Sequence, residues 1–254
     1  MTDLLTELQD HVLCITLNRV SKRNAFDDTL LTALYDSLEK AAVNALVHVI
    51  LLKANGSDFS AGADLNWMQR MVHYTEAENS ADALILARLM HTLHHHPKPT
   101  IAMVQGAAIG GGAGLVAACD IAIAADTARF RFSEVTLGLI PAVISPYVIK
   151  AMGERVALNL FLSAETFDAQ RAYHLNLIHH CVPEDTLLSF TIDYAKQLAN
   201  LPPLALIATK SLVHQVANRP ITDDLIQQTA RLIAKQRISP EAQHGLKTFL
   251  GKKG

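Results

Sequence analysis

The sequence has few cysteines and no concentration of charge of either sign. Its three cysteines, Cys14, Cys119 and Cys181, are widely spaced, so they cannot be the framework of a small disulfide-rich protein. A reducing, cytoplasmic location is expected. Lys and Arg number 22 against 24 Asp and Glu, a net charge of −2, and no block of like charges occurs. This balance argues against nucleic acid or an anionic membrane as the main partner.

Several familiar sequence signatures are also missing. The first residues, MTDLLTELQDHV, are interrupted by acidic side chains, so neither a signal peptide nor a transit peptide is expected. There is no C-x-x-C pair, and there is no G-x-S-x-G elbow of the kind that serine hydrolases carry. With 50% hydrophobic and 18% charged residues, disorder and a coiled coil are both poor interpretations.

One uncharged run, from Ile101 to Cys119, is long enough to cross a membrane. Five of its residues are glycine, and each glycine costs about 1 kcal/mol in a helix relative to alanine. A buried strand, a glycine turn and a short helix fit this run better than a membrane span.

The pattern of apolar residues predicts an α/β fold. Strands are expected near residues 11–17, 48–54, 100–105 and 120–125, and the continuous apolar run at 48–54 is typical of a strand buried on both faces. Helices are expected from Asp27 or Asp28 to Ala45, from about Leu65 and over about 81–93. We therefore expect an α/β core over residues 1–190 and a helical region over residues 191–254, the two forming one functional unit.

Two glycine turns follow buried strands, one at Ala61-Gly62-Ala63 and one at Gly110 to Gly114. Glycine lets a ligand approach the backbone closely, and the first N–H groups of a helix have no partner within it. Two such groups that converge on one point would form an oxyanion hole, which stabilises an enolate. The alternative is that both segments are turns and nothing more.

Glu134 is the carboxylate with the clearest chemical interest. If the alternation of Phe130 and Phe132 continues, Glu134 points to the same apolar side as the two rings. Burial would raise its pKa, which suits proton transfer near neutral pH. A glutamate that turns to water at a strand end is the equally simple alternative.

Other candidate sites are weaker. The segment Gly112-x-Gly114-x-x-Ala117 fits a dinucleotide fingerprint, but the helix before the next strand is too short for it. The run His94 to His96 invites a metal assignment, yet neighbouring helical residues point in different directions. No metal site is expected, and Asp120 is expected to be a hydrogen-bonded structural residue.

Together the motifs resemble the crotonase (enoyl-CoA hydratase/isomerase) superfamily, in its order and over almost the whole chain. The matching segments are NRVSKRNAF at 18–26, FSAGADL at 59–65, QGAAIGGGAGLVAACDIAIA at 105–124, FRFSEVTLGLIP at 130–141 and SPEAQHGLKTFLGKK at 239–253. The resemblance implies a crotonase-like spiral of ββα turns. It also implies a helical C-terminal region that builds homotrimers, usually paired into homohexamers.

The resemblance also implies roles for single residues. The N–H groups of Ala63 and Gly111 would hold the thioester carbonyl of an acyl-CoA, and Glu134 would exchange a proton at its α-carbon. CoA is then part of the substrate, and no separate cofactor is implied. Further residues are implied in substrate or CoA binding, with Phe249 and Lys252 reaching a neighbouring site: Lys22, Asn24, Ala25, Ala61, Asp64, Leu65, Gly110, Ala142, Tyr147, Phe249 and Lys252.

The sequence departs from the family pattern at one position. Typical hydratases carry a second glutamate twenty positions before the first to activate water, and here that position is Gly114. A single carboxylate suffices to move a double bond, so the sequence leaves hydratase and isomerase open. The segments GADLNWMQRM and GLIPAVISPYVI resemble a hydratase branch that acts on 3-methylglutaconyl-CoA and carboxygeranoyl-CoA.

We expect first an enoyl-CoA hydratase, second a 3,2-enoyl-CoA isomerase and third a non-catalytic acyl-CoA binder. In the hydratase, the Ala142 N–H would hold water, with help from Ser145 or Tyr147. Removing either hydroxyl should then slow hydration about tenfold or more. Three residues after the first glycine turn are candidates for the acyl pocket, although ordinary core is the alternative for them: Trp67, Met68 and Met71.

Overall fold

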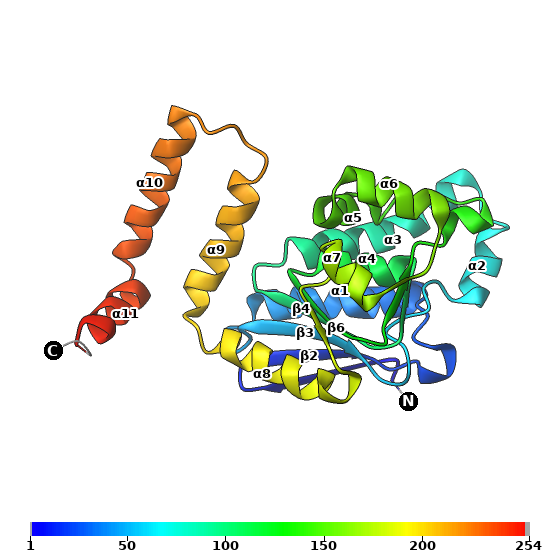
Figure 1. Cartoon of the computed structure of the whole chain (residues 1–254), viewed down its shortest axis with the longest axis horizontal. Helices are drawn as coiled ribbons and strands as arrows, with labels where there is room; N and C mark the ends of the chain where they lie inside the picture. Colours follow the sequence, from blue (N-terminus) through cyan, green and yellow to red (C-terminus); the bar gives the residue numbers. More distant parts are fainter. Residues whose placement is uncertain (1, 252–254) are drawn as a thin grey trace.

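The longest apolar runs form a six-stranded sheet, seen in a computed structural model that describes residues 2–251 (Figure 1). Its strand order is β1-β2-β3-β4-β6-β9, and all neighbours are parallel except β1 and β2. The strands are β1 (Leu4–Gln9), β2 (Val12–Leu17), β3 (Val49–Ala54), β4 (Thr100–Val104), β6 (Ile121–Ala125) and β9 (His180–Val182). A smaller sheet contains β5 (Ala107–Ile109), β7 (Arg129–Arg131) and β8 (Phe167–Asp168).

Helices cover both faces of the large sheet, which explains why β3 is apolar throughout. Ile50 and Leu52 face a core formed with α1 (Asp28–Val43), α3 (Glu76–His94) and α4 (Gly111–Ala118). Val49 and Leu51 face the opposite side, where α8 (Leu187–Ala199) packs (Figure 1). Successive strand residues point to opposite faces of the sheet, so the residues on both faces of β3 must be apolar.

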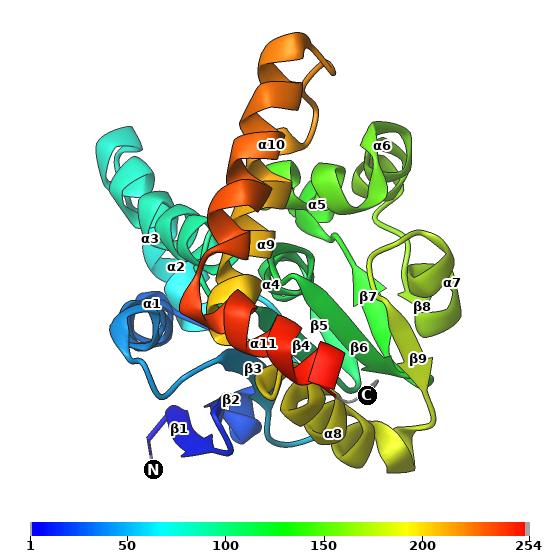
Figure 2. The same cartoon turned by 90° about the vertical axis from the view of Figure 1, so that its left-hand side faces the viewer.

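Shorter elements surround this core. They are α2 (Leu65–Met71), α5 (Ser145–Met152), α6 (Glu154–Ser163), α7 (Ala169–His174) and the 3₁₀ turns η1 (Val20–Lys22), η2 (Glu134–Leu137) and η3 (Glu184–Thr186). The C-terminal helices α9 (Pro203–Val216), α10 (Asp223–Arg237) and α11 (Pro240–Gly251) extend to one side of the sheet, as Figures 1 and 2 show. No helix among the described residues is long and apolar enough to span a membrane.

The predicted helix starts are partly confirmed. Asp27 caps α1 and Asp64 caps α2, each through its side chain. The helix expected from about residue 81 instead begins at Glu76, because Thr75 and Glu78 form a reciprocal capping box. The strand β1 was not predicted, since its residues lie on an exposed sheet edge and show no buried face.

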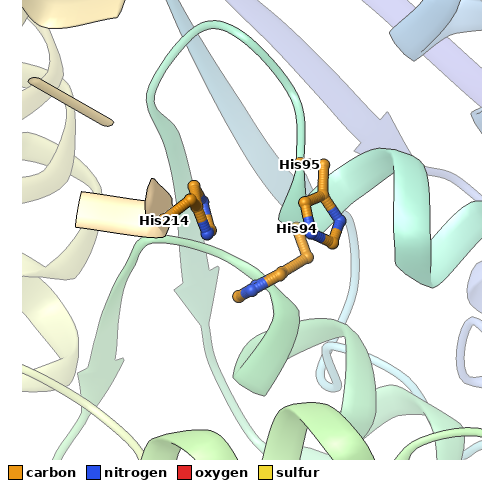
Figure 3. Close-up of side chains that lie close together, drawn as sticks. All are labelled: His94, His95 and His214. Carbon is orange, nitrogen blue, oxygen red and sulfur yellow. The ribbon is translucent and has the colours of Figure 1, made fainter. Parts of the chain in front are cut away.

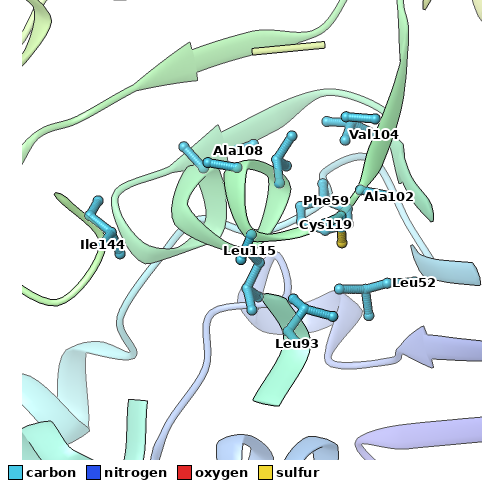
Figure 4. Packing of buried hydrophobic residues seen from close by; sticks show 14 of the residues in the cluster. Leu52, Phe59, Leu93, Ala102, Val104, Ala108, Leu115, Cys119 and Ile144 are labelled. Carbon is cyan, nitrogen blue, oxygen red and sulfur yellow. The ribbon is translucent and has the colours of Figure 1, made fainter. Parts of the chain in front are cut away.

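Packing around α4 is tight and positions the site. Leu115 of this helix and Cys119 just after it belong to one buried cluster with Leu93 of α3 and with Ile144 from the segment before α5 (Figure 4). The helix α4 contains three glycines, Gly111, Gly112 and Gly114, and a Cβ added at any of them would lie less than 3.0 Å from a neighbouring side chain. The closest approach is at Gly114, described below.

Candidate active site

A cavity of about 980 Å³ lies between the two glycine turns and α3. Its walls are mostly apolar, with side chains from α2, α3 and the segment 137–144. Trp67, Met68 and Met71 all line it, as the sequence suggested. Glu134 enters the same cavity together with Ala63 and Gly111, so the three predicted catalytic positions are brought to one place.

The amides of Ala63 and Gly111 are available to a ligand. Gly111 is the first residue of α4, and Ala63 lies in the turn before α2. Neither N–H donates a hydrogen bond to another group within residues 2–251. Both residues line the cavity, so this pair can receive a carbonyl oxygen in the manner of an oxyanion hole.

Neighbouring bonds hold the first turn in shape. Phe26 donates its N–H to the carbonyl of Gly62, and Asp64 donates its N–H to the carbonyl of Phe26, both at 2.9 Å. Gly62 has φ +92°, a conformation that favours glycine, and a Cβ there would lie 3.0 Å from the Ile109 carbonyl oxygen. The turn is therefore fixed on both sides of Ala63.

Glu134 reaches the cavity by a different backbone path from the predicted one. The strand ends at Arg131, and Glu134 opens the 3₁₀ turn η2 rather than continuing the alternation. Its side chain still lies inside: Oε2 is buried without a hydrogen-bond partner among the described residues. Burial raises the pKa of Glu134, as expected from the sequence.

Gly110 gives the Glu134 carboxylate its space. A Cβ added at Gly110 would lie 3.2 Å from Glu134 Oε1, and its φ of +53° is a strained conformation for other residues. Gly110 therefore acts by leaving room beside the carboxylate, without a side chain of its own.

The space into which a second glutamate at residue 114 would project is filled by Ile144. A Cβ on Gly114 would lie 2.8 Å from the Cβ of Ile144 and closer still to its Cγ2. Ile144 is 2% exposed, and it is a residue that the sequence analysis missed. Asp82 is the only other carboxylate among the described lining residues, and it accepts a hydrogen bond from Trp67 Nε1 at 2.9 Å.

The loop implied in nucleotide binding is internally bonded. Lys22 Nζ donates to Asp64 Oδ2 at 2.6 Å, on a lysine side chain that is 41% exposed. Burial alone would raise the pKa of Asp64, but hydrogen bonds from Lys22 and from the α2 amides outweigh it and lower that pKa. Asp64 is thus a helix cap and an ion-pair partner, while Lys22 can still reach solvent.

Asn24 and Ala25 are buried in the same loop. The Asn24 side chain donates to the carbonyls of Asn55 and Asp58 at 2.7 and 2.8 Å and accepts from the Arg19 N–H at 2.9 Å. This side chain holds the loop together. Ala61, which is partly exposed, donates its N–H to the Arg23 carbonyl.

None of the three groups suggested for water handling is free in the Glu134 cavity, although Ala142 lines it. The Ala142 N–H donates to the Ile140 carbonyl at 2.8 Å, so this amide is already occupied. Ser145 donates to the Ala142 carbonyl and does not line the described Glu134 cavity. Tyr147 lines a second cavity, where its ring contacts His94. Ile144, which precedes α5, and Val148 of α5 are buried, while Tyr147 lies toward the second cavity, which the sequence could not show.

The remaining predicted positions lie at two ends of the fold. Leu65 is 76% exposed and lines the mouth of the cavity. Phe249 is on α11, on the opposite side of the molecule from α2 (Figure 1), so it does not meet this cavity within one chain. Lys252 lies outside the described residues.

Comparison with known proteins gives one consistent answer. The family model for enoyl-CoA hydratase/isomerase matches residues 7–254. A crystal structure from Legionella pneumophila, assigned to enoyl-CoA hydratase/isomerase (crotonase), is 60% identical with a TM-score of 0.96, covering 99% of this chain and 97% of that one. An enoyl-CoA hydratase from Shewanella pealeana is 43% identical with a TM-score of 0.95, covering 99% and 94%.

Curated relatives agree. A 2,3-dehydroadipyl-CoA hydratase from Escherichia coli is 33% identical over 257 residues, covering 100% of this chain and 97% of that protein. The predicted crotonase-like α/β fold is confirmed by these structural matches. The chain belongs to the enoyl-CoA hydratase/isomerase family, the crotonase superfamily.

Proposed function

We propose that the protein hydrates a 2-enoyl-CoA thioester, with Glu134 as the acid–base group. The observation that carries this proposal is the buried, unpartnered Oε2 of Glu134 in a cavity that also holds the free amides of Ala63 and Gly111. The amides bind a developing negative charge, and the carboxylate moves the proton that accompanies it.

A single carboxylate can balance the whole addition. The ionised Glu134 accepts a proton from water as the water oxygen bonds to C3 of the enoyl group. Electrons of the C2–C3 double bond move toward the thioester oxygen, giving an enolate held by the Ala63 and Gly111 amides. Protonated Glu134 then delivers its proton to C2, which restores the carboxylate and leaves a 3-hydroxyacyl thioester.

Isomerisation of a 3-enoyl-CoA is the second candidate function. Ile144 occupies the space beside Gly114, so no second carboxylate can flank the substrate there. An isomerase needs none, because Glu134 would take a proton from C2 and return it to C4. The same amides would hold the intermediate dienolate.

The lining of the cavity favours a neutral, apolar acyl group. Its described charged residues are Glu134 and Asp82, both acidic, and none of them is Lys or Arg. A carboxylate carried on the acyl chain would enter this cavity without a cationic partner, at an unfavourable desolvation cost. We therefore expect short or branched apolar chains to be preferred over 3-methylglutaconyl-CoA.

The proton transfers proposed here involve no change of oxidation state, so we expect no cofactor besides the CoA of the substrate. We also propose that the protein assembles as a homotrimer or a hexamer of two trimers. The support is the apolar surface on the C-terminal helices, where Leu204, Ile226 and Ile238 are 60%, 54% and 78% exposed. Light scattering on the purified protein would test the assembly.

Product analysis tests the proposed reaction. Crotonyl-CoA, 3-methylglutaconyl-CoA and a 3-enoyl-CoA are each incubated with the wild type and with Glu134→Gln, and the products are analysed by mass. Gain of one water from crotonyl-CoA, lost in the variant, supports hydration. A double bond that shifts at unchanged mass supports the isomerase instead. Tight CoA-ester binding with no turnover of any substrate would overturn both in favour of a non-catalytic binder.

A further inference from the structure

Three histidines meet beside a second cavity, away from the Glu134 site, and two of them, His94 and His214, line it. His94 and His95 end α3 and follow it, and His214 comes from α9 (Figure 3). One ring nitrogen of each lies within 4.8 Å of the others. Among the described residues, the two cavities share no lining residue, so this cluster plays no part in the proposed hydration.

We infer that His94, His95 and His214 form a site for a divalent transition-metal ion, with zinc the best match. Neutral imidazoles are preferred zinc ligands, and three of them leave a fourth position for water. Zn–N bonds of about 2.0–2.1 Å in a tetrahedral site place the nitrogens about 3.4 Å apart. Small side-chain rotations close the present spacing to that value, since two of the three rings are only partly buried and the third is exposed.

The ligand nitrogens are chemically ready. Nδ1 of His95 donates to the His91 carbonyl at 3.1 Å, which fixes the ring and leaves Nε2 with its lone pair. His94 Nε2 accepts a hydrogen bond from Lys150 Nζ at 3.1 Å, so this nitrogen also presents a lone pair.

Two lysines lie near the cluster and must be accounted for. Lys210 donates to Asp120 at 2.7 Å, so its charge is already paired. Lys150 Nζ donates to His94 Nε2 at 3.1 Å and competes with a metal for that nitrogen. The side chain of Lys150 is exposed and can turn into solvent, which frees His94.

The sequence could not reveal this site, because its third ligand lies far along the chain. Three adjacent histidines were expected not to share one ion, and His96 is not part of the cluster. It is 2% exposed, and its ring nitrogens lie at hydrogen-bond distance from the carbonyls of Leu38 and Lys98. His94 and His95 instead turn toward α9. None of the residues of α9 is buried, so a metal here would clip this helix to the end of α3.

The test uses the full chain without a histidine tag. Zn²⁺ uptake is measured by competition with a chelating dye, and Co²⁺ is added separately to read its visible absorption bands. We expect saturable uptake of one ion per chain and tetrahedral Co²⁺ bands. His214→Ala should weaken uptake at least about tenfold, because even outer-sphere partners of a ligand contribute that much. His94→Gln should do the same, and Lys150→Met should tighten binding.

Two matched variants keep the inference falsifiable. His174→Ala removes a histidine of the same cavity that is outside the cluster, and His91→Ala removes a ring stacked on His95 at 4.3 Å. Both should bind as the wild type does, and circular dichroism should show all variants folded. No uptake by the wild type, or uptake that survives His214→Ala, would overturn the site. Loss of Zn²⁺ uptake in His91→Ala would instead assign the ion to His91 and His95 at the end of α3.

Discussion

Gly114→Ala tests whether the space beside residue 114 is closed to a side chain. The added Cβ would lie 2.8 Å from the Ile144 Cβ and 3.1 Å from the terminal methyl of Met90, and both side chains are buried. Overpacking of this kind typically costs about 1–3 kcal/mol. Alanine recovers about 1 kcal/mol of helix propensity in α4. We therefore expect a net loss of up to about 2 kcal/mol in the free energy of unfolding.

Ile144→Ala supplies the second arm of a double-mutant cycle. Alone it should cost about 2–5 kcal/mol, as removal of a buried isoleucine side chain does. In the double variant the new methyl at residue 114 occupies part of the space left by Ile144. The combined cost should fall below the sum of the single costs by about 0.5–3 kcal/mol.

Urea unfolding measures the cycle, read by the fluorescence of Trp67. This residue is the only tryptophan and is 3% exposed, so its emission should change on unfolding. Strictly additive costs, or a Gly114→Ala variant that is more stable than the wild type, would refute the contact between residues 114 and 144.

Three further predictions follow from named contacts. Burial raises the pKa of Glu134, so its negative charge destabilises the fold above that pKa. Glu134→Gln should therefore raise the unfolding temperature at pH 8, and this gain should disappear below about pH 4.5, where Glu134 is protonated in both the folded and the unfolded state. The same variant should lower kcat about 10²–10⁴-fold. Asp58, bonded to Arg23, has its pKa lowered to about 2; the stability it adds should disappear as the pH falls from 3.8 to 2, and urea midpoints of Asp58→Asn should change less over that range. Tyr147→Phe and Ser145→Ala should leave hydration rates unchanged, because neither side chain lines the described Glu134 cavity; a slowed rate in either would return it to the mechanism.

Local sequence signals predicted the parts of the site that depend on neighbouring residues. The Asp64 cap, the glycine turn before it and the buried strand β3 follow from short-range chemistry, and the structure contains all of them. The alternation of Phe130 and Phe132 predicted that Glu134 points inward from a longer strand. Its side chain does lie inside, but a 3₁₀ turn carries it.

Contacts between distant segments were not predictable in this way. Ile144 covers Gly114 only because α5 begins after an irregular segment whose direction no periodicity encodes. The same helix sends Tyr147 to the other cavity. His214 joins His94 only through the placement of α9, which no local motif encodes.

Exchange of α-protons tests the central claim most directly, because it isolates proton transfer by Glu134 from the identity of the final reaction. Butyryl-CoA is incubated in D₂O with the wild type and with Glu134→Gln, and deuterium at C2 is measured by mass. The account predicts exchange with the wild type and its loss in the variant, with butyryl-CoA still bound by both. Exchange that persists in Glu134→Gln, or its absence in a wild type that binds butyryl-CoA, would contradict the assignment of Glu134.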